Sequence, residues 1–135
     1  MPALTLLADT ARDLMTPGPV SITSTATVAE ATAFLTDRGF GAAVVIDSAG
    51  HPVGVVTRTD LLIHARERGG NGGQSPVRGV MTEGVFSVQE TTPARSVVGQ
   101  LVGLNVHHLF VVDGSGILVG VISTLDVLRH LEVTR

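Results

Sequence analysis

Two short segments of the sequence combine residue types that suit a phosphorylated ligand. Each has a glycine, two apolar residues, a hydroxyl residue and, three positions later, an aspartate: Gly54-Val55-Val56-Thr57-Arg58-Thr59-Asp60 and Gly120-Val121-Ile122-Ser123-Thr124-Leu125-Asp126. An apolar run followed by a hydroxyl residue predicts a strand that leads into the N-terminus of a helix, where unpaired backbone amides and a partial positive charge favour phosphate. The aspartate can accept hydrogen bonds from both hydroxyls of a ribose, and the glycine lets the backbone approach a ligand closely.

The same spacing also has a purely structural explanation. Ser/Thr-x-x-Asp is a capping box, in which the hydroxyl and the carboxylate satisfy backbone amides of their own helix. For one copy, capping is the simpler explanation, and a second copy in the same register weakens it without removing it. Ligand binding and helix capping therefore both stay open for these residues.

The two segments differ at one position that matters for a polyphosphate. Arg58 follows Thr57 and supplies a cation that can pair with phosphate, whereas Thr124 holds that position in the second segment. We therefore expect the first segment to be the better polyphosphate site. The cations expected near the second segment are His107, His108 and Arg129.

The elements that must position these segments come from an internal duplication. At one constant offset and without a gap, the two halves match in an opening Met-Thr pair, an Asp-x-x-Gly turn, a Gly-Val pair and the motif aspartate. The matching residues include Met15-Thr16 with Met81-Thr82, Gly50 with Gly116, and Asp60 with Asp126. Chance similarity between two β-rich segments does not keep this register, so we predict two copies of one unit.

Each copy is expected to fold as β-α-β-β-α, which makes the protein an α+β fold. The expected elements of the first copy are a strand at Val20–Ile22, a helix ending near Gly39, strands at Ala42–Ile46 and Val53–Val56, and a helix opening near Asp60. Those of the second are a strand at Phe86–Val88, a helix ending near Asn105, strands at Leu109–Val112 and Ile117–Ile122, and a helix opening near Asp126. Because one such unit is marginally stable alone, we expect the two pseudo-symmetric repeats to pack sheet to sheet.

Local signals set the expected ends of the first helix in each copy. Thr27 and Glu30 predict a capping box, and Gly39 is a natural C-terminal stop. In the second copy, Thr92 is expected to cap a helix whose first position is Pro93.

The expected organisation is an N-terminal extension at residues 1–10, a first repeat at 11–66, a flexible linker at 67–76 and a second repeat at 77–132. The linker, which includes Gly69-Gly70-Asn71-Gly72-Gly73, is polar and glycine-rich, with no apolar side chain to bury.

The composition of the chain of 135 residues excludes several chemistries. There is no lysine for a Schiff base or a P-loop, and no cysteine for thiol catalysis or a thiolate metal site. A net charge of −3 and four phenylalanines as the only aromatic residues argue against nucleic-acid binding. No apolar run is long enough to span a membrane, and the first residues lack the basic charge of a secretory signal, so a cytoplasmic protein is expected. The five histidines suggest a metal site, but the adjacent His107 and His108 would point to opposite faces of a strand, so no metal is expected.

From about Arg12 to His130, the sequence resembles a tandem cystathionine-β-synthase (CBS) domain pair, also called a Bateman module. The resemblance rests on motifs that occur twice or in register. They are the Asp-Leu-Met-Thr and Gly-Val-Met-Thr openings, the Thr-Val-x-Glu-Ala helix start, the Val-Val-Ile-Asp-x-x-Gly hairpin, and the two closing segments Gly-Val-Val-Thr-Arg-Thr-Asp-Leu-Leu and Gly-Val-Ile-Ser-Thr-Leu-Asp-Val-Leu.

The resemblance implies a regulatory function. Such modules bind adenosine-type ligands such as AMP, ADP, ATP or S-adenosylmethionine in clefts between the two repeats, with the hydroxyl residue on phosphate and the aspartate on ribose. Those roles fall on Thr57 with Asp60, and on Ser123 with Asp126. The residues implied as walls for the base are Ile22, Gly41 and Ala42 in the first cleft and Val88, His107 and His108 in the second.

The resemblance also implies a protein without catalytic activity that senses a nucleotide and controls a partner protein in trans. A homodimer is expected, with exposed helix faces such as Val97–Val102 as its contact. No nucleophile, base and orienting group come together in the sequence and no metal set appears, so neither enzymatic activity nor a catalytic cofactor is expected. The alternative is a structural or oligomerisation module whose clefts do not bind a ligand.

Overall fold

The computed structural model describes residues 2–134. The chain divides into two compact units, and neither unit has the same bounds as a single repeat. Unit 1 joins the N-terminal residues as far as Pro19 to the chain from Phe86 onward, and unit 2 is Val20–Val85.

Unit 2 is a four-stranded sheet with helices that follow its strands, in the strand order β3-β4-β5-β6. β3 is parallel to β4, because the helix α2 connects them, while the β4–β5 hairpin and the β5–β6 pair are antiparallel. Its elements are β3 (Ser21–Thr23), α2 (Val28–Arg38), β4 (Ala42–Ile46), β5 (Pro52–Thr57), α3 (Arg58–Arg68), the 3-10 helices η1 (Gly69–Gln74) and η2 (Val77–Gly79), and β6 (Thr82–Glu83).

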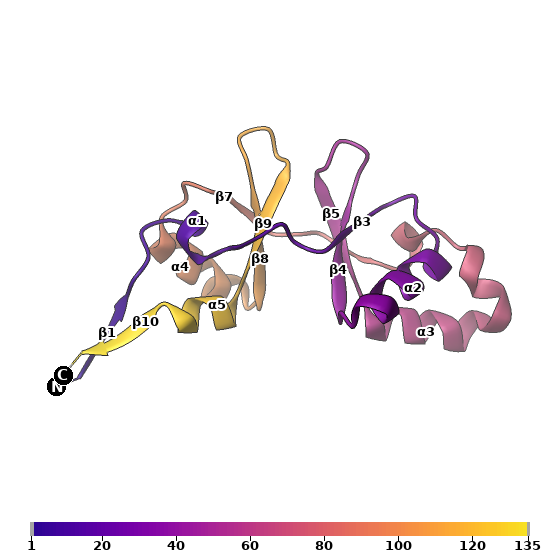
Figure 1. Ribbon diagram of the computed structural model, residues 1–135, viewed down its shortest axis with the longest axis horizontal. Coiled ribbons are helices and arrows are strands. Elements are labelled where there is room, and N and C mark those ends of the chain that lie inside the picture. The colour runs from indigo at the N-terminus through magenta and orange to yellow at the C-terminus, as the bar shows by residue number, and fades with distance from the viewer. Residues whose placement is uncertain (1, 135) are drawn as a thin grey trace. The chain divides into compact units, whose positions relative to one another are not determined.

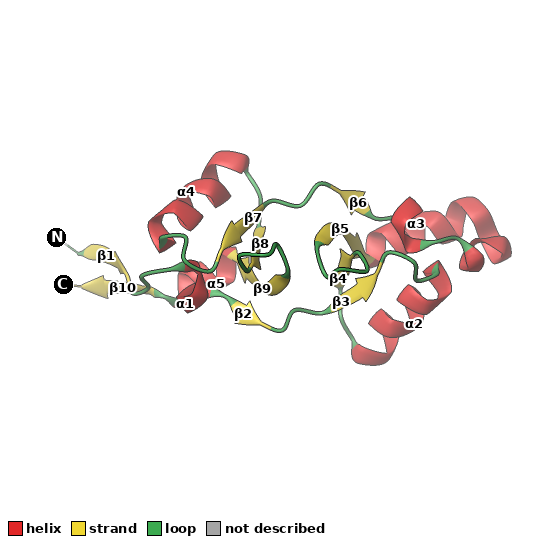
Figure 2. Cartoon of the chain, turned by 90° about the horizontal axis from the view of Figure 1, so that it is seen from above, coloured by secondary structure: helices red, strands yellow, loops and turns green. Residues whose placement is uncertain are grey.

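Unit 1 repeats this arrangement in the strand order β2-β9-β8-β7, and adds a separate two-stranded sheet of β1 and β10 (Figure 2). Its elements are β1 (Ala3–Leu6), α1 (Ala11–Leu14), β2 (Thr16–Pro17), β7 (Ser87–Gln89), α4 (Ala94–Leu104), β8 (His108–Val112), β9 (Leu118–Ser123), α5 (Thr124–Arg129) and β10 (Leu131–Thr134). The predicted α+β class and the β-α-β-β-α order of both copies are therefore confirmed.

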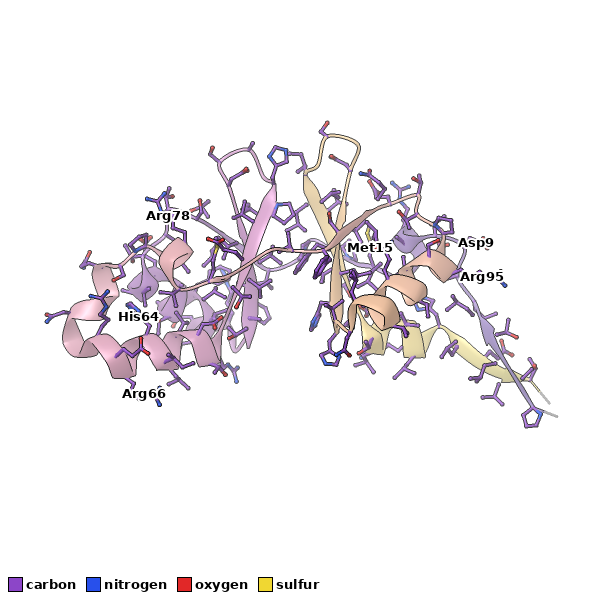
Figure 3. All side chains as sticks on the ribbon, turned by 180° about the vertical axis from the view of Figure 1, so that it is seen from behind. Asp9, Met15, His64, Arg66, Arg78 and Arg95 are labelled. Carbon is purple, nitrogen blue, oxygen red and sulfur yellow. The ribbon has the colours of Figure 1, made fainter. Side chains whose placement is uncertain are left out.

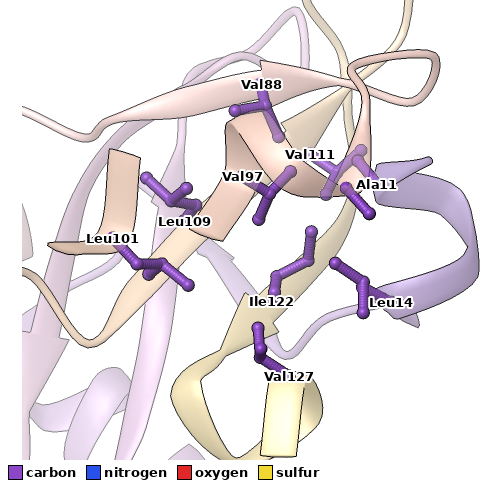
Figure 4. Close-up of a cluster of buried hydrophobic side chains, with 10 residues drawn as sticks. Ala11, Leu14, Val88, Val97, Leu101, Leu109, Val111, Ile122 and Val127 are labelled. Carbon is purple, nitrogen blue, oxygen red and sulfur yellow. The ribbon is translucent and has the colours of Figure 1, made fainter. Parts of the chain in front are cut away.

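The opening segment of each repeat packs with the body of the other repeat. Ala11 and Leu14 of α1 are buried in the core of unit 1, beside Val97, Leu109 and Ile122 of the second repeat (Figure 4). In the same way, Val77 of the second opening segment is buried in the core of unit 2 among residues of the first repeat. The short strands follow the same exchange, since β2 pairs with β9 and β6 pairs with β5.

Most of the predicted helix caps are confirmed. Thr27 and Glu30 form the capping box of α2, and Gly39 and Asn105 end α2 and α4 in the left-handed conformation with φ of 68° and 53°. The prediction for Thr92 is wrong, because the hydroxyl of Thr92 accepts a hydrogen bond from the Gln89 amide at 3.0 Å instead of capping α4. Pro93 itself occupies the position before the helix and has no cap to offer.

Within the segment predicted as a flexible linker, residues Gly69–Gln74 form the 3-10 helix η1, which packs against α2 and α3. Backbone groups hold it in place, since the His64 ring lies 3.0 Å from the Gly72 carbonyl oxygen. The amide of Val28 also donates to the Ser75 carbonyl oxygen at 2.8 Å. Gly72 is buried, and a Cβ atom there would lie 3.0 Å from atoms of His64 and Arg68, closer than most side chains tolerate. Glycine thus supplies close packing in this segment, a use that composition alone does not distinguish from flexibility.

We expect the N-terminus of α1 to make the stability of unit 1 dependent on pH. The amides of Asp9 and Thr10 donate hydrogen bonds to the Asp13 carboxylate at 2.9 and 3.1 Å, which lowers the pKa of Asp13 below its usual value. A depressed pKa stabilises the folded state above the ordinary aspartate value of about 3.9, and this stabilisation is lost as the pH falls through the folded pKa.

We therefore expect Asp13→Asn to lower the free energy of unfolding at pH 7, and the difference from the native protein to shrink as the pH falls below about 4. Urea unfolding of both proteins at several pH values measures this. A difference that stays constant between neutral and acid pH would contradict the role of the charge.

Candidate ligand-binding site

The two predicted segments lie at strand-to-helix junctions that have the same construction in both units. α3 begins directly after β5, and Thr57 is its N-cap; α5 begins directly after β9, and Ser123 is its N-cap. The sequence folds this way because a β-branched apolar run favours a strand, whereas a hydroxyl residue with an aspartate three positions later favours a helix start.

Both junctions contain a complete capping box. The Asp60 amide donates to the Thr57 hydroxyl at 3.1 Å, and the Thr57 amide donates to the Asp60 carboxylate at 2.9 Å. The corresponding distances for Ser123 and Asp126 are 3.1 and 2.8 Å. The structural explanation of the motif is thus confirmed in both copies.

At the first junction, the capping box leaves one carboxylate oxygen of Asp60 available. The box uses Oδ2 of Asp60, and among the described residues no hydrogen bond or ion pair reaches its Oδ1. Asp60 is half-buried, whereas Asp126 is buried, and Oδ1 of Asp126 lies 3.8 Å from an Arg129 guanidinium nitrogen. The first junction therefore offers a freer carboxylate, and its helix has 11 residues against six in α5.

Arg58 is engaged with its own unit. Its Nε and Nη2 donate hydrogen bonds at 3.1 Å to the carbonyl oxygens of Phe40 and Gly39, at the C-terminal end of α2. Such carbonyls lack partners within the helix, so a guanidinium stabilises them. Arg58 could therefore contact a phosphate only through Nη1, unless its side chain gives up the hydrogen bonds to Phe40 and Gly39.

Four of the six predicted wall residues lie beside the helix starts. Gly41 and Ala42 are at the start of β4, where Ala42 pairs with Thr57, and the Arg58 amide donates to the Gly41 carbonyl oxygen at 3.0 Å. His107 and His108 hold the same positions in unit 1. His108 pairs with Ser123, and the Thr124 amide donates to the His107 carbonyl oxygen at 3.0 Å.

The other two wall residues lie apart from the helix starts. Ile22 pairs with Val45, three residues along β4 from Ala42, and Ile22 packs against the core of unit 2. At about 3.3 Å per residue, three residues amount to about 10 Å of strand. Val88 is 4% exposed and belongs to the core of unit 1. Both residues lie in the short strands β3 and β7, and their side chains contribute to the cores of their units.

Gly54 and Gly120 were expected to let the backbone approach a ligand, but each lies against a methionine side chain instead. A Cβ atom at Gly120 would lie 2.5 Å from the sulfur of Met15, a residue labelled in Figure 3, and a Cβ atom at Gly54 would lie 2.6 Å from the sulfur of Met81. Both methionines come from the exchanged opening segments. The glycines therefore admit the opening segment of the other repeat.

Residues that the sequence analysis missed surround Asp60. Together with Ile63, His64 and Glu67 of α3, and with Gly79 and Val80, it lines a small cavity of about 170 Å³. Asp60, Ile63, His64 and Glu67 are spaced i, i+3, i+4 and i+7, which places them on one face of α3. This spacing is the sequence signal that could have identified the cavity.

A larger groove of about 850 Å³ is lined by residues of α2, α3 and η1, and its lining does not include Thr57 or Asp60. Arg58 is its one predicted site residue, and much of its lining is small or apolar, including Ala29, Ala33, Leu62 and Ala65. Among residues 2–134, no group of three or more histidines or acidic residues is arranged to hold a metal ion. No helix in that range combines the length and the apolar character needed to cross a membrane.

Known proteins share this architecture. An AMP complex of the CBS domain protein PAE2072 from Pyrobaculum aerophilum is 28% identical, with a TM-score of 0.70 over 87% of this chain and 88% of that one. The structure of CBSX2 in complex with AMP is 26% identical, with a TM-score of 0.73 over 90% of this chain and 95% of that one. An uncharacterized protein of Methanopyrus kandleri, MK0525, is 28% identical over 118 residues, which are 87% of this chain. This chain spans 58% of the length of that relative.

The family model named CBS domain matches twice, at residues 11–67 and 77–133. These ranges contain both halves of the duplication, both exchanged opening segments and both capping boxes. The protein is therefore a member of the CBS domain family and carries two CBS domains in tandem.

Proposed function

We propose that this protein is a regulatory module that senses an adenosine-containing ligand, AMP, ADP, ATP or S-adenosylmethionine, and controls a partner protein in trans. One observation carries the proposal: the same strand-to-helix junction, with a hydroxyl residue and an aspartate at the helix start, occurs in both repeats. Two structures of similar architecture contain AMP, which supports an adenine nucleotide as the ligand class.

The first junction is the better candidate for a phosphorylated ligand. The Thr57 hydroxyl and the Thr59 amide would donate to phosphate, and Oδ1 of Asp60 would accept hydrogen bonds from ribose, while the amides of Arg58 and Asp60 keep their hydrogen bonds within the unit. Gly41 and Ala42 lie beside this helix start and would flank the ligand. At the second junction Asp126 is buried and close to Arg129, so we propose weaker binding there.

The proposed role is binding without catalysis. A sensor needs a ligand that shifts the population of two states, and a partner protein that distinguishes them. The polar groups at the two junctions are hydroxyls, carboxylates, histidines and two arginines, which suffice to hold a nucleotide. Purified protein incubated with ATP should gain thermal stability without product formation.

A thermal-stability panel with AMP, ADP, ATP, NAD and S-adenosylmethionine tests the function. At a ligand concentration of about 100 Kd, a ligand that binds only the folded state adds about 2.7 kcal/mol to the free energy of unfolding, which a melting curve resolves. If no member of the panel raises the Tm, the proposal fails and the alternative, a structural module with non-binding clefts, is favoured.

Variants that remove one carboxylate charge locate the site. Asp60→Asn is expected to weaken binding of the identified ligand strongly in isothermal titration, and Asp126→Asn to weaken it less. Glu30→Gln is the matched control, because it alters the capping box of α2, away from both junctions. Equal loss of affinity in Asp60→Asn and Glu30→Gln would show that the effect is general destabilisation.

We also propose a homodimer that forms through exposed helix faces. The predicted contact at Val97–Val102 needs refinement, because Val97 and Leu101 are buried in the core while Val102 is 77% exposed. Leu125 and Leu128 of α5 are exposed in the same unit, at 51% and 60%. Val102→Glu should therefore lower the mass of the assembly in solution if this face forms the dimer.

A further inference from the structure

Met15 and Met81 hold the same place in the two units. The Met15 sulfur lies 2.5 Å from where a Cβ atom of Gly120 would be, and the Met81 sulfur lies 2.6 Å from the corresponding point at Gly54. Each thioether therefore fills the space that a strand glycine leaves open. The strands concerned, β9 and β5, are the second strands of the β8–β9 and β4–β5 hairpins (Figure 1).

Each methionine directly precedes a very short strand of its opening segment. β2 pairs with β9, and β6 pairs with β5, through two residues in each case. One of those in β2 is Pro17, which has no amide hydrogen to donate, and the Gly18 amide reaches the Val119 carbonyl oxygen only at 3.3 Å. Met15 and Met81 pack against the cores of their units. Because the strands make so few hydrogen bonds, this packing supplies a large share of their attachment.

Both sulfur atoms are placed where oxidation has a structural consequence. The chain has no cysteine, so methionine is its only sulfur-containing residue type. Met15 and Met81 are half-buried rather than fully enclosed. Exposure governs the oxidation of sulfur in proteins, and partial exposure leaves access for a small two-electron oxidant of the peroxide class.

Hydrogen peroxide transfers one oxygen atom to a thioether. The sulfur lone pair forms the S–O bond while the O–O bond breaks, and the departing hydroxide takes the proton of the transferred hydroxyl group to become water. Sulfur loses two electrons and the peroxide gains them. The product is the sulfoxide, which is polar, and which methionine sulfoxide reductases convert back to the thioether.

A sulfoxide does not suit the space over the glycine. The added oxygen either presses against the backbone of β9 or β5, or turns the side chain towards water and leaves the space empty. Both outcomes remove the packing, and a sulfoxide that stays in place without a hydrogen-bond donor carries the cost of a buried polar group. We propose that Met15 and Met81 are a matched pair of oxidation sites, and that their conversion to the sulfoxide by a peroxide detaches β2 from β9 and β6 from β5.

The expected change is local. Ala11 and Leu14 of α1 stay buried in the core of unit 1, and Val77 stays buried in the core of unit 2. The opening segments therefore remain anchored upstream of each methionine, while the short strands downstream are released.

Hydrogen exchange combined with peptide mapping tests the proposal on the full chain. Protein treated with hydrogen peroxide is compared with untreated protein, and the masses of the peptides that contain Met15 and Met81 give the extent of oxidation. We expect each methionine to gain one oxygen atom, and exchange to accelerate several-fold in the β2–β9 and β5–β6 pairs but not in α2 or α4. Reductases for both sulfoxide epimers should restore the original rates.

Met15→Leu and Met81→Leu are matched variants, because leucine keeps a similar apolar volume and has no sulfur to oxidise. Met15→Leu should abolish the response of the β2–β9 pair and leave that of the β5–β6 pair, and Met81→Leu should do the reverse. Met15→Gln, which places a polar side chain of similar length over Gly120, should accelerate exchange in the β2–β9 pair without peroxide.

Three results would each overturn the proposal. They are thioethers that resist peroxide in the folded protein but react in urea, sulfoxide formation with unchanged exchange, and a response that persists in the unit whose methionine is replaced by leucine. None of these measurements uses a nucleotide or depends on a dimer. Failure of the oxidation sites is therefore distinguishable from failure of the proposed function.

Discussion

Replacement of Leu14 by alanine is expected to lower the free energy of unfolding by about 2–5 kcal/mol, the usual cost of removing a buried leucine side chain. Leu14 is 1% exposed and is among the largest fully buried side chains of the molecule. It lies in an opening segment that belongs by sequence to the first repeat, yet apart from Ala11 of the same helix the other buried residues of its core come from the second repeat. Urea unfolding monitored by circular dichroism measures the loss.

The location of the damage tests the exchange of opening segments. Hydrogen exchange should accelerate in β8 and β9 of unit 1 more than in β4 and β5 of unit 2, because Leu14 packs in the core of unit 1. Leu7→Ala is the matched control, since Leu7 is 54% exposed and its loss should cost far less. Faster exchange confined to β4 and β5 would show that Leu14 packs with its own repeat.

Gly54→Ala should destabilise the protein by about 1–3 kcal/mol, the range for an extra methyl group in a filled space. The added Cβ would lie 2.6 Å from the Met81 sulfur and 2.8 Å from the Thr82 carbonyl oxygen. The methionine side chain can rotate away, but the backbone oxygen belongs to β6, which pairs with β5 at this point. Relief of the collision therefore requires a shift of the strand.

Gly120→Ala is the informative comparison for Gly54→Ala. Its three nearest contacts, from 2.5 to 3.1 Å, all come from the flexible Met15 side chain, so its cost should be smaller. Gly99→Ala is the control, because nothing lies within 4 Å of a Cβ there and the position is inside α4. Alanine should stabilise that helix by about 0.5–1 kcal/mol. Thermal unfolding of the three variants ranks them, and equal losses at Gly54 and Gly120 would contradict the role of the β6 backbone.

The elements that the sequence predicted well are those fixed by neighbouring residues. The Thr27–Glu30 box and the left-handed stops at Gly39 and Asn105 depend on interactions within four or five positions, and all are present. The predicted cap at Thr92 is wrong for a local reason too. Its hydroxyl can accept from an amide on either side, and it accepts from the Gln89 amide upstream.

At the candidate site, the sequence located the two helix starts, but it left capping and binding open. The structure establishes capping, because the amides that the hydroxyl and carboxylate satisfy are in the same turn. It also assigns Arg58 to the end of α2, a partner 18 and 19 positions away that no local pattern indicates.

By itself, the sequence determined the duplication, the class of fold and the position of each strand-to-helix junction, because periodicity, capping and turn preferences act over a few residues. Only the tertiary structure decided that Leu14 and Val77 pack in the body of the other repeat, that Gly54 and Gly120 admit methionines, and that the two ends pair in one ribbon. The physical reason is that these contacts join segments far apart in the chain. The apolar character of a residue indicates that its side chain will be buried, but not which surface will bury it.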